Sequence, residues 1–278
     1  MTRYSLLFLP LVLLGALEIV QASQATTAQT QSRSAVGIDA LAPEQRTRIE
    51  QLAKLQKHFG KDLNSSGVDL TLKEIGRSRI DDRSVVQYEL YATGFRANSD
   101  FTLFQVQMDG STVKRAEGVT LDKNGRAICG GEKGKCQGNG PDDPIILVVS
   151  AAIGEPKRFI LVSNDTLQSK GFVSVTPYPN AAIDGSCRLE SVLGSENGEL
   201  IFIQGSGFAP GTDLAVDSQS YGEKRQQSVR AGTDGSYFAT LMPYVQGKKS
   251  GTTVFQVKSK TCSPTITFKW GENSYHPE

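Results

Sequence analysis

Histidine is nearly absent from this chain, which limits the chemistry that it can perform. The 278 residues include only two histidines, His58 and His276, and neither lies in the β-rich stretches described below. A serine or cysteine nucleophile that needs a histidine base would have to recruit one of these two, and no Gly-x-Ser-x-Gly motif is present. The sequence therefore gives no indication of a catalytic triad.

The chain also lacks an excess of either charge. It carries 30 Lys and Arg against 29 Asp and Glu, a formal net charge of +1. Removal of residues 1–25 would take away Arg3 and Glu18 and leave this balance unchanged. A near-neutral chain gives no electrostatic reason to bind nucleic acid or an acidic membrane, so we expect neither as a partner.

No apolar run is long enough for a membrane span, which takes roughly 20 residues. The run from Leu6 to Leu17 is broken by Pro10 and Gly15 and ends at Glu18. Small residues then follow at the spacing that signal peptidase reads, in Val-Gln-Ala and Ser-Gln-Ala. We predict a signal peptide over residues 1–25, with an uncleaved anchor as the alternative. No cysteine follows the run, so no lipid anchor is expected. The mature chain would be secreted, periplasmic or held in the cell envelope.

Cysteine is sparse, with four residues, and export would place all of them in an oxidising setting where disulfides persist. Cys129 and Cys136 enclose a glycine-rich segment that can close into a small loop, and we pair them by proximity. Cys187 and Cys262 then remain to join the two ends of a second domain. Three connectivities are open to four cysteines. A zinc site would need two close pairs, so we expect no metal and no other cofactor.

The segment after the signal peptide contains almost no bulky apolar residues and is expected to be a disordered leader over residues 26–41. Residues 42–60 then predict one amphipathic helix. Pro43 and Glu44 suit its first turn, Lys57 its last turn, and Gly60 its end. Its apolar face consists of Ile49, Leu52, Leu55 and Phe59. The helix either packs on the first domain or binds a partner, and it lacks the sustained heptads of a coiled coil.

From Val68 onward, short alternating runs separated by Gly, Asp, Asn and Pro predict an all-β protein. We expect two tandem immunoglobulin-like β-sandwiches, over residues 66–176 and 184–271, joined by a linker over 177–183 and followed by a tail over 272–278. Strands are expected in the first at 68–72, 84–93, 101–108, 126–129, 145–152 and 158–162, and the last two of these are expected to form a hairpin around Gly154. Residues 172–176 either close this sheet or lead into the linker. Strands in the second are expected at 188–192, 199–204, 213–218, 227–231, 237–242, 252–258 and 265–270.

One motif occurs twice and supports the tandem arrangement. The segments Tyr91–Phe101 and Ile203–Leu214 each contain a strand-like run, a Gly-Phe pair, a turn and a second alternating run. Their glycines lie 113 residues apart, a typical domain length. We expect the glycine to end a strand with positive φ and the phenylalanine to cap the core. The residues concerned are Gly94 and Phe95 in the first copy, and Gly207, Phe208, Pro210 and Gly211 in the second, where Pro210-Gly211 makes the turn.

The second copy resembles the turn shared by bacterial immunoglobulin-like and IPT/TIG-type domains, in Gly205-Ser-Gly-Phe-Ala-Pro-Gly-Thr-Asp213. Their second hallmark, an Asp-Gly turn before an aromatic-rich strand, is similar to Asp234-Gly235 with the residues that follow. The first half carries a weaker copy, with Asp122-Lys-Asn-Gly125 as its later turn. The resemblance covers about two thirds of the chain and implies fold only. Such domains usually serve adhesion, spacing or binding.

These observations favour a non-catalytic binding or adhesion-type module with a protein or polysaccharide partner. Tyr178, Tyr221 and Tyr244 could supply aromatic contact area, whereas Trp270 is expected in the core. The alternative is a purely structural spacer of the envelope. A third hypothesis is a carboxylate-based hydrolase, for which Asp142-Asp143 is the most suitable pair. Because adjacent strand residues point to opposite faces, we interpret that pair as part of a solvated loop.

Overall fold

The computed structural model describes residues 63–130, 135–136, 140, 142–272 and 274. The predicted signal peptide, leader and amphipathic helix lie outside these residues, as does most of the tail. The described residues form four antiparallel sheets. No helix among them is long and apolar enough to cross a membrane.

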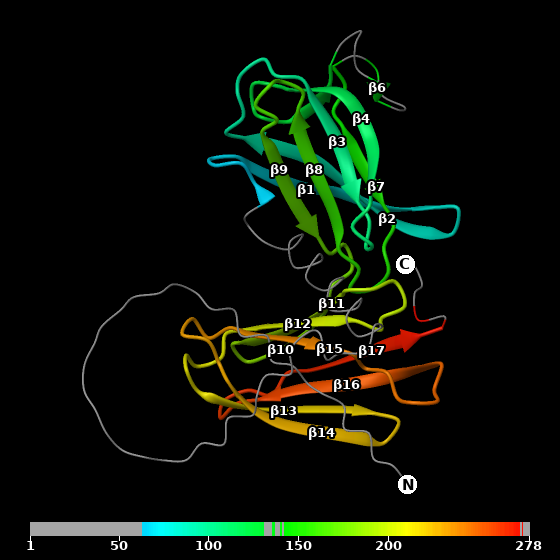
Figure 1. Cartoon of the computed structure of the whole chain (residues 1–278), viewed down its shortest axis with the longest axis vertical. Helices are drawn as coiled ribbons and strands as arrows, with labels where there is room; N and C mark the ends of the chain where they lie inside the picture. The colour runs from blue at the N-terminus through cyan, green and yellow to red at the C-terminus, as the bar shows by residue number, and fades with distance from the viewer. Residues whose placement is uncertain (1–62, 131–134, 137–139, 141, 273, 275–278) are drawn as a thin grey trace, which may run out of the picture.

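The first sandwich, as we call strands β1–β9, consists of two sheets in the orders β1-β2-β7 and β5-β4-β3-β8-β9, with β6 paired to β4 (Figure 1). Its core lies between them, because inward-facing residues of both sheets meet there. Val86, Tyr88 and Leu90 of one sheet meet Leu103 and Phe159 of the other in one buried cluster. The strands are β1 (Asp69–Ile80), β2 (Arg83–Thr93), β3 (Phe101–Val106), β4 (Thr112–Leu121), β5 (Ala127–Cys129), β6 (Lys135–Cys136), β7 (Ile146–Val149), β8 (Lys157–Ser163) and β9 (Lys170–Val175).

The second sandwich, strands β10–β17, has sheets in the orders β10-β11-β12-β15 and β14-β13-β16-β17. Leu189 and Ile203 of one sheet and Phe255 and Phe268 of the other share its core. Trp270 is buried, as expected. The strands are β10 (Asn180–Asp184), β11 (Cys187–Leu193), β12 (Ile201–Ser206), β13 (Asp213–Ser220), β14 (Glu223–Arg230), β15 (Tyr237–Leu241), β16 (Ser250–Lys258) and β17 (Thr265–Gly271).

The two sandwiches meet at the loop between β7 and β8. The backbone N–H of Leu193 donates to the carbonyl of Gly154, and the N–H of Gly154 donates to the carbonyl of Tyr178. Arg77 of β1 reaches the same region, where its guanidinium donates to the carbonyl of Pro177 and lies 5.3 Å from the centre of the Tyr178 ring. The connection between the sandwiches is therefore held by hydrogen bonds from both sides.

The hairpin expected around Gly154 does not form. β7 pairs with β2 and β8 pairs with β3 and β9, so these strands belong to different sheets. The loop between them is a crossover whose residues Ala151, Ala152 and Glu155 are buried. The crossover contains a tight turn in which the N–H of Glu155 donates to the carbonyl of Ala152, and the Glu155 carboxylate accepts a hydrogen bond from the N–H of Ala152.

Three strands lie where none was predicted. Residues 180–184, expected in the linker, form β10, which pairs with β11. Lys135–Cys136 forms the short β6. Thr112–Leu121 forms β4, whose register with β3 shifts after Phe101 and after Leu103, so the polar and apolar residues do not alternate along it. β9, by contrast, closes the sheet, which was one of the two possibilities for its residues.

The repeated Gly-Phe motif takes the same conformation in both sandwiches. Gly94 has φ +79° and Gly207 has φ +78°. A methyl group on either would strike a backbone carbonyl oxygen just before the neighbouring paired strand, at 1.8 Å for Gly67 before β1 and at 1.9 Å for Ser186 before β11. Both phenylalanines, Phe95 and Phe208, pack against their cores. The sequence repeat is therefore a structural repeat.

Candidate functional site

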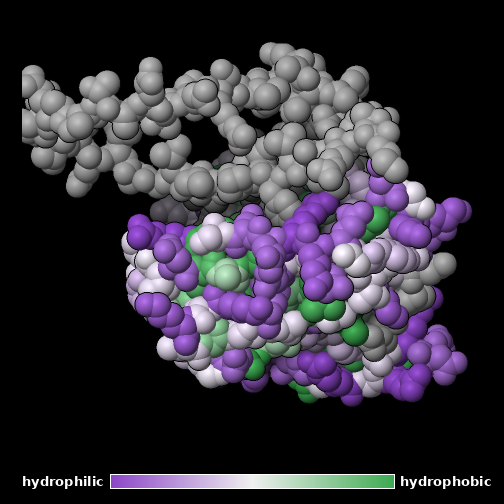
Figure 2. Space-filling model, turned by 90° about the horizontal axis from the view of Figure 1, so that it is seen from below, coloured by the Kyte–Doolittle hydropathy of each residue, from purple (hydrophilic) through white to green (hydrophobic). Residues whose placement is uncertain are grey.

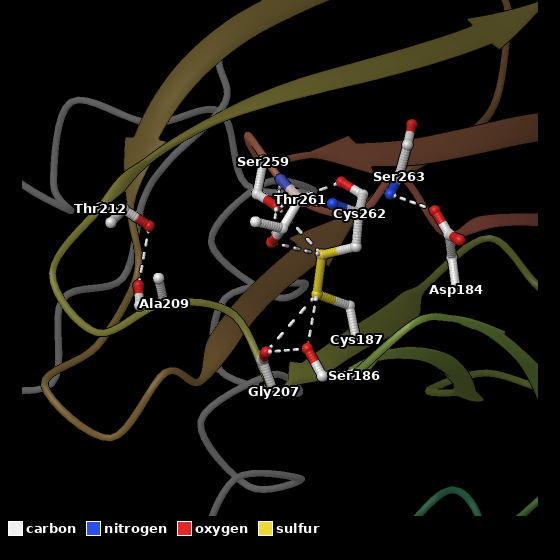
Figure 3. The surroundings of a disulfide bond; sticks show 10 residues. All are labelled: Asp184, Ser186, Cys187, Gly207, Ala209, Thr212, Ser259, Thr261, Cys262 and Ser263. Atoms are coloured by element: carbon white, nitrogen blue, oxygen red, sulfur yellow. Dashed lines mark hydrogen bonds between the residues drawn. A yellow bond between two sulfur atoms is a disulfide. The ribbon is translucent and has the colours of Figure 1, made fainter.

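Two disulfides are present, and their pairing is the one predicted from proximity along the sequence. The Cα atoms of Cys129 and Cys136 lie 5.9 Å apart, and those of Cys187 and Cys262 lie 6.2 Å apart. Figure 3 shows the second bond joining the start of β11 to the turn between β16 and β17, beside the carbonyl oxygen of Gly207. This bond links the two sheets of the second sandwich and supports the Gly-Phe turn.

The acidic pair considered for hydrolysis lies in the turn next to the smaller disulfide. The Asp143 carboxylate accepts a hydrogen bond of 2.7 Å from the N–H of Gly140, and Asp142 has φ +64° with its N–H bonded to the carbonyl of Cys129. Both residues therefore shape the turn. Among the described residues, no group of three or more His, Cys, Asp and Glu side chains could hold a metal ion.

The three tyrosines suggested for ligand contact have different environments. Tyr178 is half-buried against the first core under Arg77. Tyr244 borders a cavity of about 20 Å³, too small for a ligand. Tyr221 is 55% exposed, and its hydroxyl donates to the carbonyl of Ser250 at 2.6 Å. Its ring also packs edge-on against Trp270 and caps the end of the core. None of the three is shown to bind a ligand, and their role stays a prediction.

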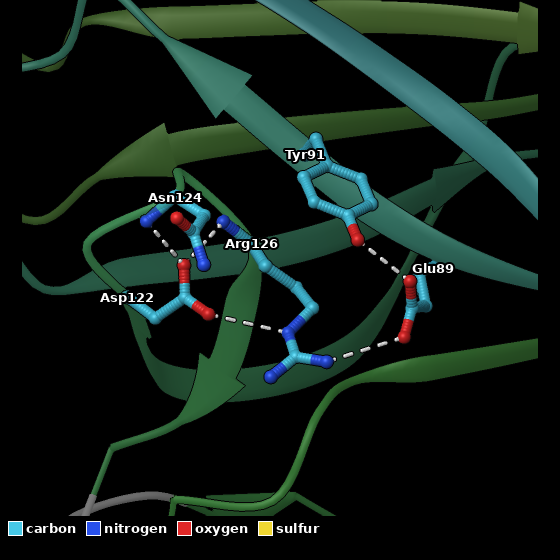
Figure 4. Close-up of polar contacts among 5 residues, drawn as sticks. All are labelled: Glu89, Tyr91, Asp122, Asn124 and Arg126. Atoms are coloured by element: carbon cyan, nitrogen blue, oxygen red, sulfur yellow. Dashed lines mark hydrogen bonds and ion pairs between the residues drawn. The ribbon is translucent and has the colours of Figure 1, made fainter.

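A polar cluster that the sequence analysis missed lies at one end of the first sandwich (Figure 4). The Tyr91 hydroxyl donates to Glu89 at 2.7 Å, and Arg126 forms ion pairs of 3.3 Å with Glu89 and with Asp122. Burial raises the pKa of Asp122, but hydrogen bonds from the N–H groups of Arg126 and Asn124 and the Arg126 charge outweigh it and hold that pKa below its usual value. Each charged side chain has a partner of opposite sign within the cluster, so we interpret it as structural.

A second polar group is buried at the β7–β8 crossover, where the two sandwiches meet. Lys157 forms an ion pair of 2.6 Å with Glu155, and Arg158 is fully buried. Burial lowers the pKa of Arg158 to about 10, although the nearby Glu155 charge acts in the opposite direction. The guanidinium therefore stays charged at neutral pH. Because these groups hold the crossover and lie away from solvent, they are not available to a ligand.

A groove of about 220 Å³ lies at one side of the first sandwich. Strand β7 forms one wall along its whole length, and the inner face of the opposite sheet forms the floor. Cys136 of the smaller disulfide forms the end of the groove next to Ala116. We refer to this cavity as the β7 groove. Its lining residues are Leu103, Gln105, Arg115, Ala116, Cys136, Ile145, Ile146, Leu147, Val148, Val149 and Phe159.

Arg115 reaches this groove because β4 bulges. Leu103 of β3 faces Ala116 and Phe104 faces Lys114, so Arg115 has no partner across the ladder. Such an extra residue changes the direction of its side chain. The guanidinium of Arg115 donates two hydrogen bonds to the amide oxygen of Gln105, one of them from Nε at 2.9 Å. No carboxylate of a described residue forms an ion pair with it.

Sequence reasoning missed both polar residues of the groove, although Gln105 left a signal. It occupies the third inward position of an alternating run, after Phe101 and Leu103, and is only 7% exposed. A polar side chain at a core position normally has a hydrogen-bond partner, and here that partner is Arg115. Arg115 itself could not be placed without knowledge of the bulge.

No protein-family model matches the chain, and no curated protein sequence matches it. Solved structures that it matches include a tetra-tandem repeat from the extending region of a large adhesion protein, at 13% identity and a TM-score of 0.25, over 74% of this chain and 50% of that one. A 1.5-MDa bacterial ice-binding adhesin matches at 10% identity and a TM-score of 0.20, over 74% and 65%. A Ca²⁺-stabilised ice-binding adhesin of an Antarctic bacterium matches at 13% and 0.20, over 75% and 49%.

This chain thus spans about half to two thirds of the length of the solved structures that it matches. At TM-scores of 0.20 to 0.25 the likeness carries no argument about this chain's function. The resemblance to IPT/TIG-type domains stays a prediction, because no family model supports it.

Proposed function

We propose that the chain is an exported, non-catalytic binding or adhesion-type module, in which two tandem immunoglobulin-like domains present a binding surface to a partner in the envelope or outside the cell. The β7 groove is the observation that carries this proposal. It combines apolar side chains, the backbone of an edge strand and a guanidinium without an ion-pair partner among the described residues. Concave sites that combine apolar side chains with a few oriented polar groups are typical of binding sites.

Export rests on the predicted signal peptide over residues 1–25 and is supported by both disulfides, which persist in oxidising compartments. The division into domains over 66–176 and 184–271 is supported by the two separate core clusters. A protein partner suits the β7 groove better than a polysaccharide does. Sugar sites are usually built around exposed aromatic rings, and the groove contains only a buried phenylalanine, Phe159.

A structural spacer is the second candidate, and the junction between the sandwiches favours it. Hydrogen bonds from Leu193, Gly154 and Arg77 hold the connection on both sides, as a rigid rod would require. The face over β13 and β14 is mostly hydrophilic, with hydrophobic residues in small, separate areas (Figure 2). Such a face is suited to solvent and not to a large apolar interface. A spacer would have no specific partner.

The experiment that separates these candidates is capture of ligands by the oxidised chain of residues 26–278. The chain is immobilised and exposed to envelope extract and to a polysaccharide panel, and the retained material is identified by mass spectrometry. A heat-denatured sample on the same support controls for non-specific retention. Specific retention of one protein supports the binding module. Retention no greater than that of the denatured control supports the spacer.

A further inference from the structure

The wall of the β7 groove is the edge of a sheet. In the order β1-β2-β7, strand β7 pairs only with β2 among the described residues. An edge strand leaves backbone N–H and C=O groups on its free side, which can pair with another extended chain. All five residues Ile145–Val149 line the groove, so the cavity runs along this edge and not into the core at one point.

The floor of the groove is apolar and belongs to the facing sheet. Leu103 and Phe159 are buried to 0% and 1% exposure, and Ala116 lies beside them. At about 220 Å³ the space is below the roughly 300 Å³ at which small-molecule pockets begin. It is also open along one side. Alternate side chains of one extended strand paired with β7 would face this cavity.

The charge of the groove indicates which strand would fit. The Arg115 side chain is exposed, and among the described residues its guanidinium bonds only the neutral amide of Gln105, so it is accessible to an acidic group of a partner. Guanidinium groups bind carboxylates through two parallel hydrogen bonds, and such bonds are stronger than neutral ones. An acidic side chain on the incoming strand could form such a pair with Arg115.

The residues that line the groove are held in place without a bound strand. β6 holds Cys136 against β4, where Cys136 faces Ala116, and the disulfide to Cys129 ties β6 to the end of β5. Gln105 and Arg115 hold each other in place by two hydrogen bonds. A site whose walls do not need to be ordered on binding loses less entropy when its ligand arrives.

We propose that the β7 groove binds an extended strand of a partner protein by β-strand addition to Ile146–Val149. Alternate side chains of the partner face the groove between β7 and the opposite sheet, and an acidic side chain among them forms a bidentate pair with Arg115. This inference rests on the proposed binding function and names the class of partner and its site.

The probe is a set of fluorescein-labelled peptides, measured by fluorescence anisotropy against the oxidised chain of residues 26–278. The first peptide has the sequence Val-Thr-Val-Thr-Asp-Thr-Val with blocked ends, so that its valines and its aspartate share one face. A second carries lysine in place of the aspartate, and a third carries proline in place of the central valine, which removes a ladder donor. We expect saturable binding of the first peptide and binding at least tenfold weaker for the other two.

Two variants of the chain test the location. Arg115→Gln should weaken binding of the aspartate peptide about tenfold and abolish the preference for aspartate over lysine. Val148→Lys places a charge on the edge strand at a side chain that is 48% exposed, so the fold should tolerate it while strand addition is blocked. Val254→Lys, at a side chain 42% exposed on β16, is the matched control and should bind as the parent does. Thermal unfolding confirms that each variant is folded.

The outcomes distinguish this inference from the function on which it rests. If both groove variants retain the peptide, or if the parent does not bind it, the inference is overturned. Capture of a partner from extract by those same variants would then still support the binding function at another surface. Concentration-dependent dimers that disappear in Arg115→Gln would identify a second copy as the occupant. Protection of the β7 amides in the free monomer would identify the chain's own N-terminal residues. Either result would also overturn the inference.

Discussion

Gly94 and Gly207 are the residues on which the two sandwiches depend in the same way. Each has a positive φ. A Cβ atom at either position would lie within 2 Å of a backbone carbonyl oxygen, so only glycine fits. The later turns repeat this relation, because the carbonyl oxygen of Gly125 accepts the N–H of Ala92 and that of Gly235 accepts the N–H of Phe208. In both halves, a later glycine turn is therefore bonded to the region of the Gly-Phe motif.

We therefore predict that Gly207→Ala destabilises the chain by about 3 kcal/mol or more, since positive φ and a backbone clash at 1.9 Å act together. Gly222→Ala is the control. Gly222 has φ +80°, but a methyl group there would meet nothing within 4 Å, so only about 1 kcal/mol of backbone strain is expected. Urea unfolding monitored by circular dichroism measures both. Equal losses of unfolding free energy in the two variants would show that the backbone clash at Gly207 adds nothing to the strain of its positive φ.

Tyr221 provides a second prediction at this scale, because it covers the only tryptophan of the chain. Its ring centre lies 6.2 Å from that of Trp270, whose indole N–H donates to Ser220. Tyr221→Ala should expose Trp270 to water, shift its fluorescence emission to longer wavelength and cost about 2 kcal/mol, from one aromatic contact and one hydrogen bond. Phe238→Ala, at another exposed ring, should leave the emission unchanged. Unchanged emission of Tyr221→Ala would show that the ring does not shield Trp270.

At the scale of elements, the two disulfides close loops of very different length. Cys187 and Cys262 are 75 residues apart in sequence, and Cys129 and Cys136 are 7 apart. In the chain-entropy description, the longer loop stabilises by about 4 kcal/mol and the shorter by about 2.5 kcal/mol. Alanine at both cysteines of each bond, compared by urea unfolding, should therefore cost more for the longer loop. The reverse order would contradict the entropic account for this chain.

How much of these elements the sequence could predict depends on how regular they are. β2, β3 and β16 alternate over most of their length, and their positions were predicted to within a few residues. β4 was missed because bulges at Arg115 and Gly118 break its alternation, and β10 because Pro177 and Pro179 precede it and suggest a linker. The β7 groove could not be predicted at all. It depends on β7 and β8 entering different sheets, which local pattern does not encode.

At the scale of the whole molecule, burial of tyrosine hydroxyls links stability to alkaline pH. Burial, and to a smaller extent the Glu74 charge, raise the pKa of Tyr88 to about 12. Burial also raises the pKa of Tyr237 in the second core. A folded-state pKa above the unfolded value of about 10 means that the folded state holds its proton longer. The stabilising contribution of Tyr88 is thus complete below pH 10 and is lost as the pH rises from 10 to 12.

We predict that the free energy of unfolding falls between pH 10 and pH 12, and that Tyr88→Phe reduces the steepness of this fall. Urea unfolding at half-unit pH intervals measures the slope. Tyr221→Phe, at a tyrosine whose ring is largely exposed, is the control. A slope for Tyr88→Phe as steep as that of the parent would show that Tyr88 does not contribute to this pH dependence.

The two sandwiches present an edge strand with a groove beside it, at β7, and a junction held by hydrogen bonds. If the chain is a binding module, the partner should meet that edge. Amide hydrogen exchange of the chain, with and without the partner captured from envelope extract, tests this most directly. The account predicts that the partner slows exchange in Ile146–Val149 and leaves β14, an edge strand of the second sandwich, unchanged. Unchanged exchange at β7 in the presence of a bound partner would contradict it.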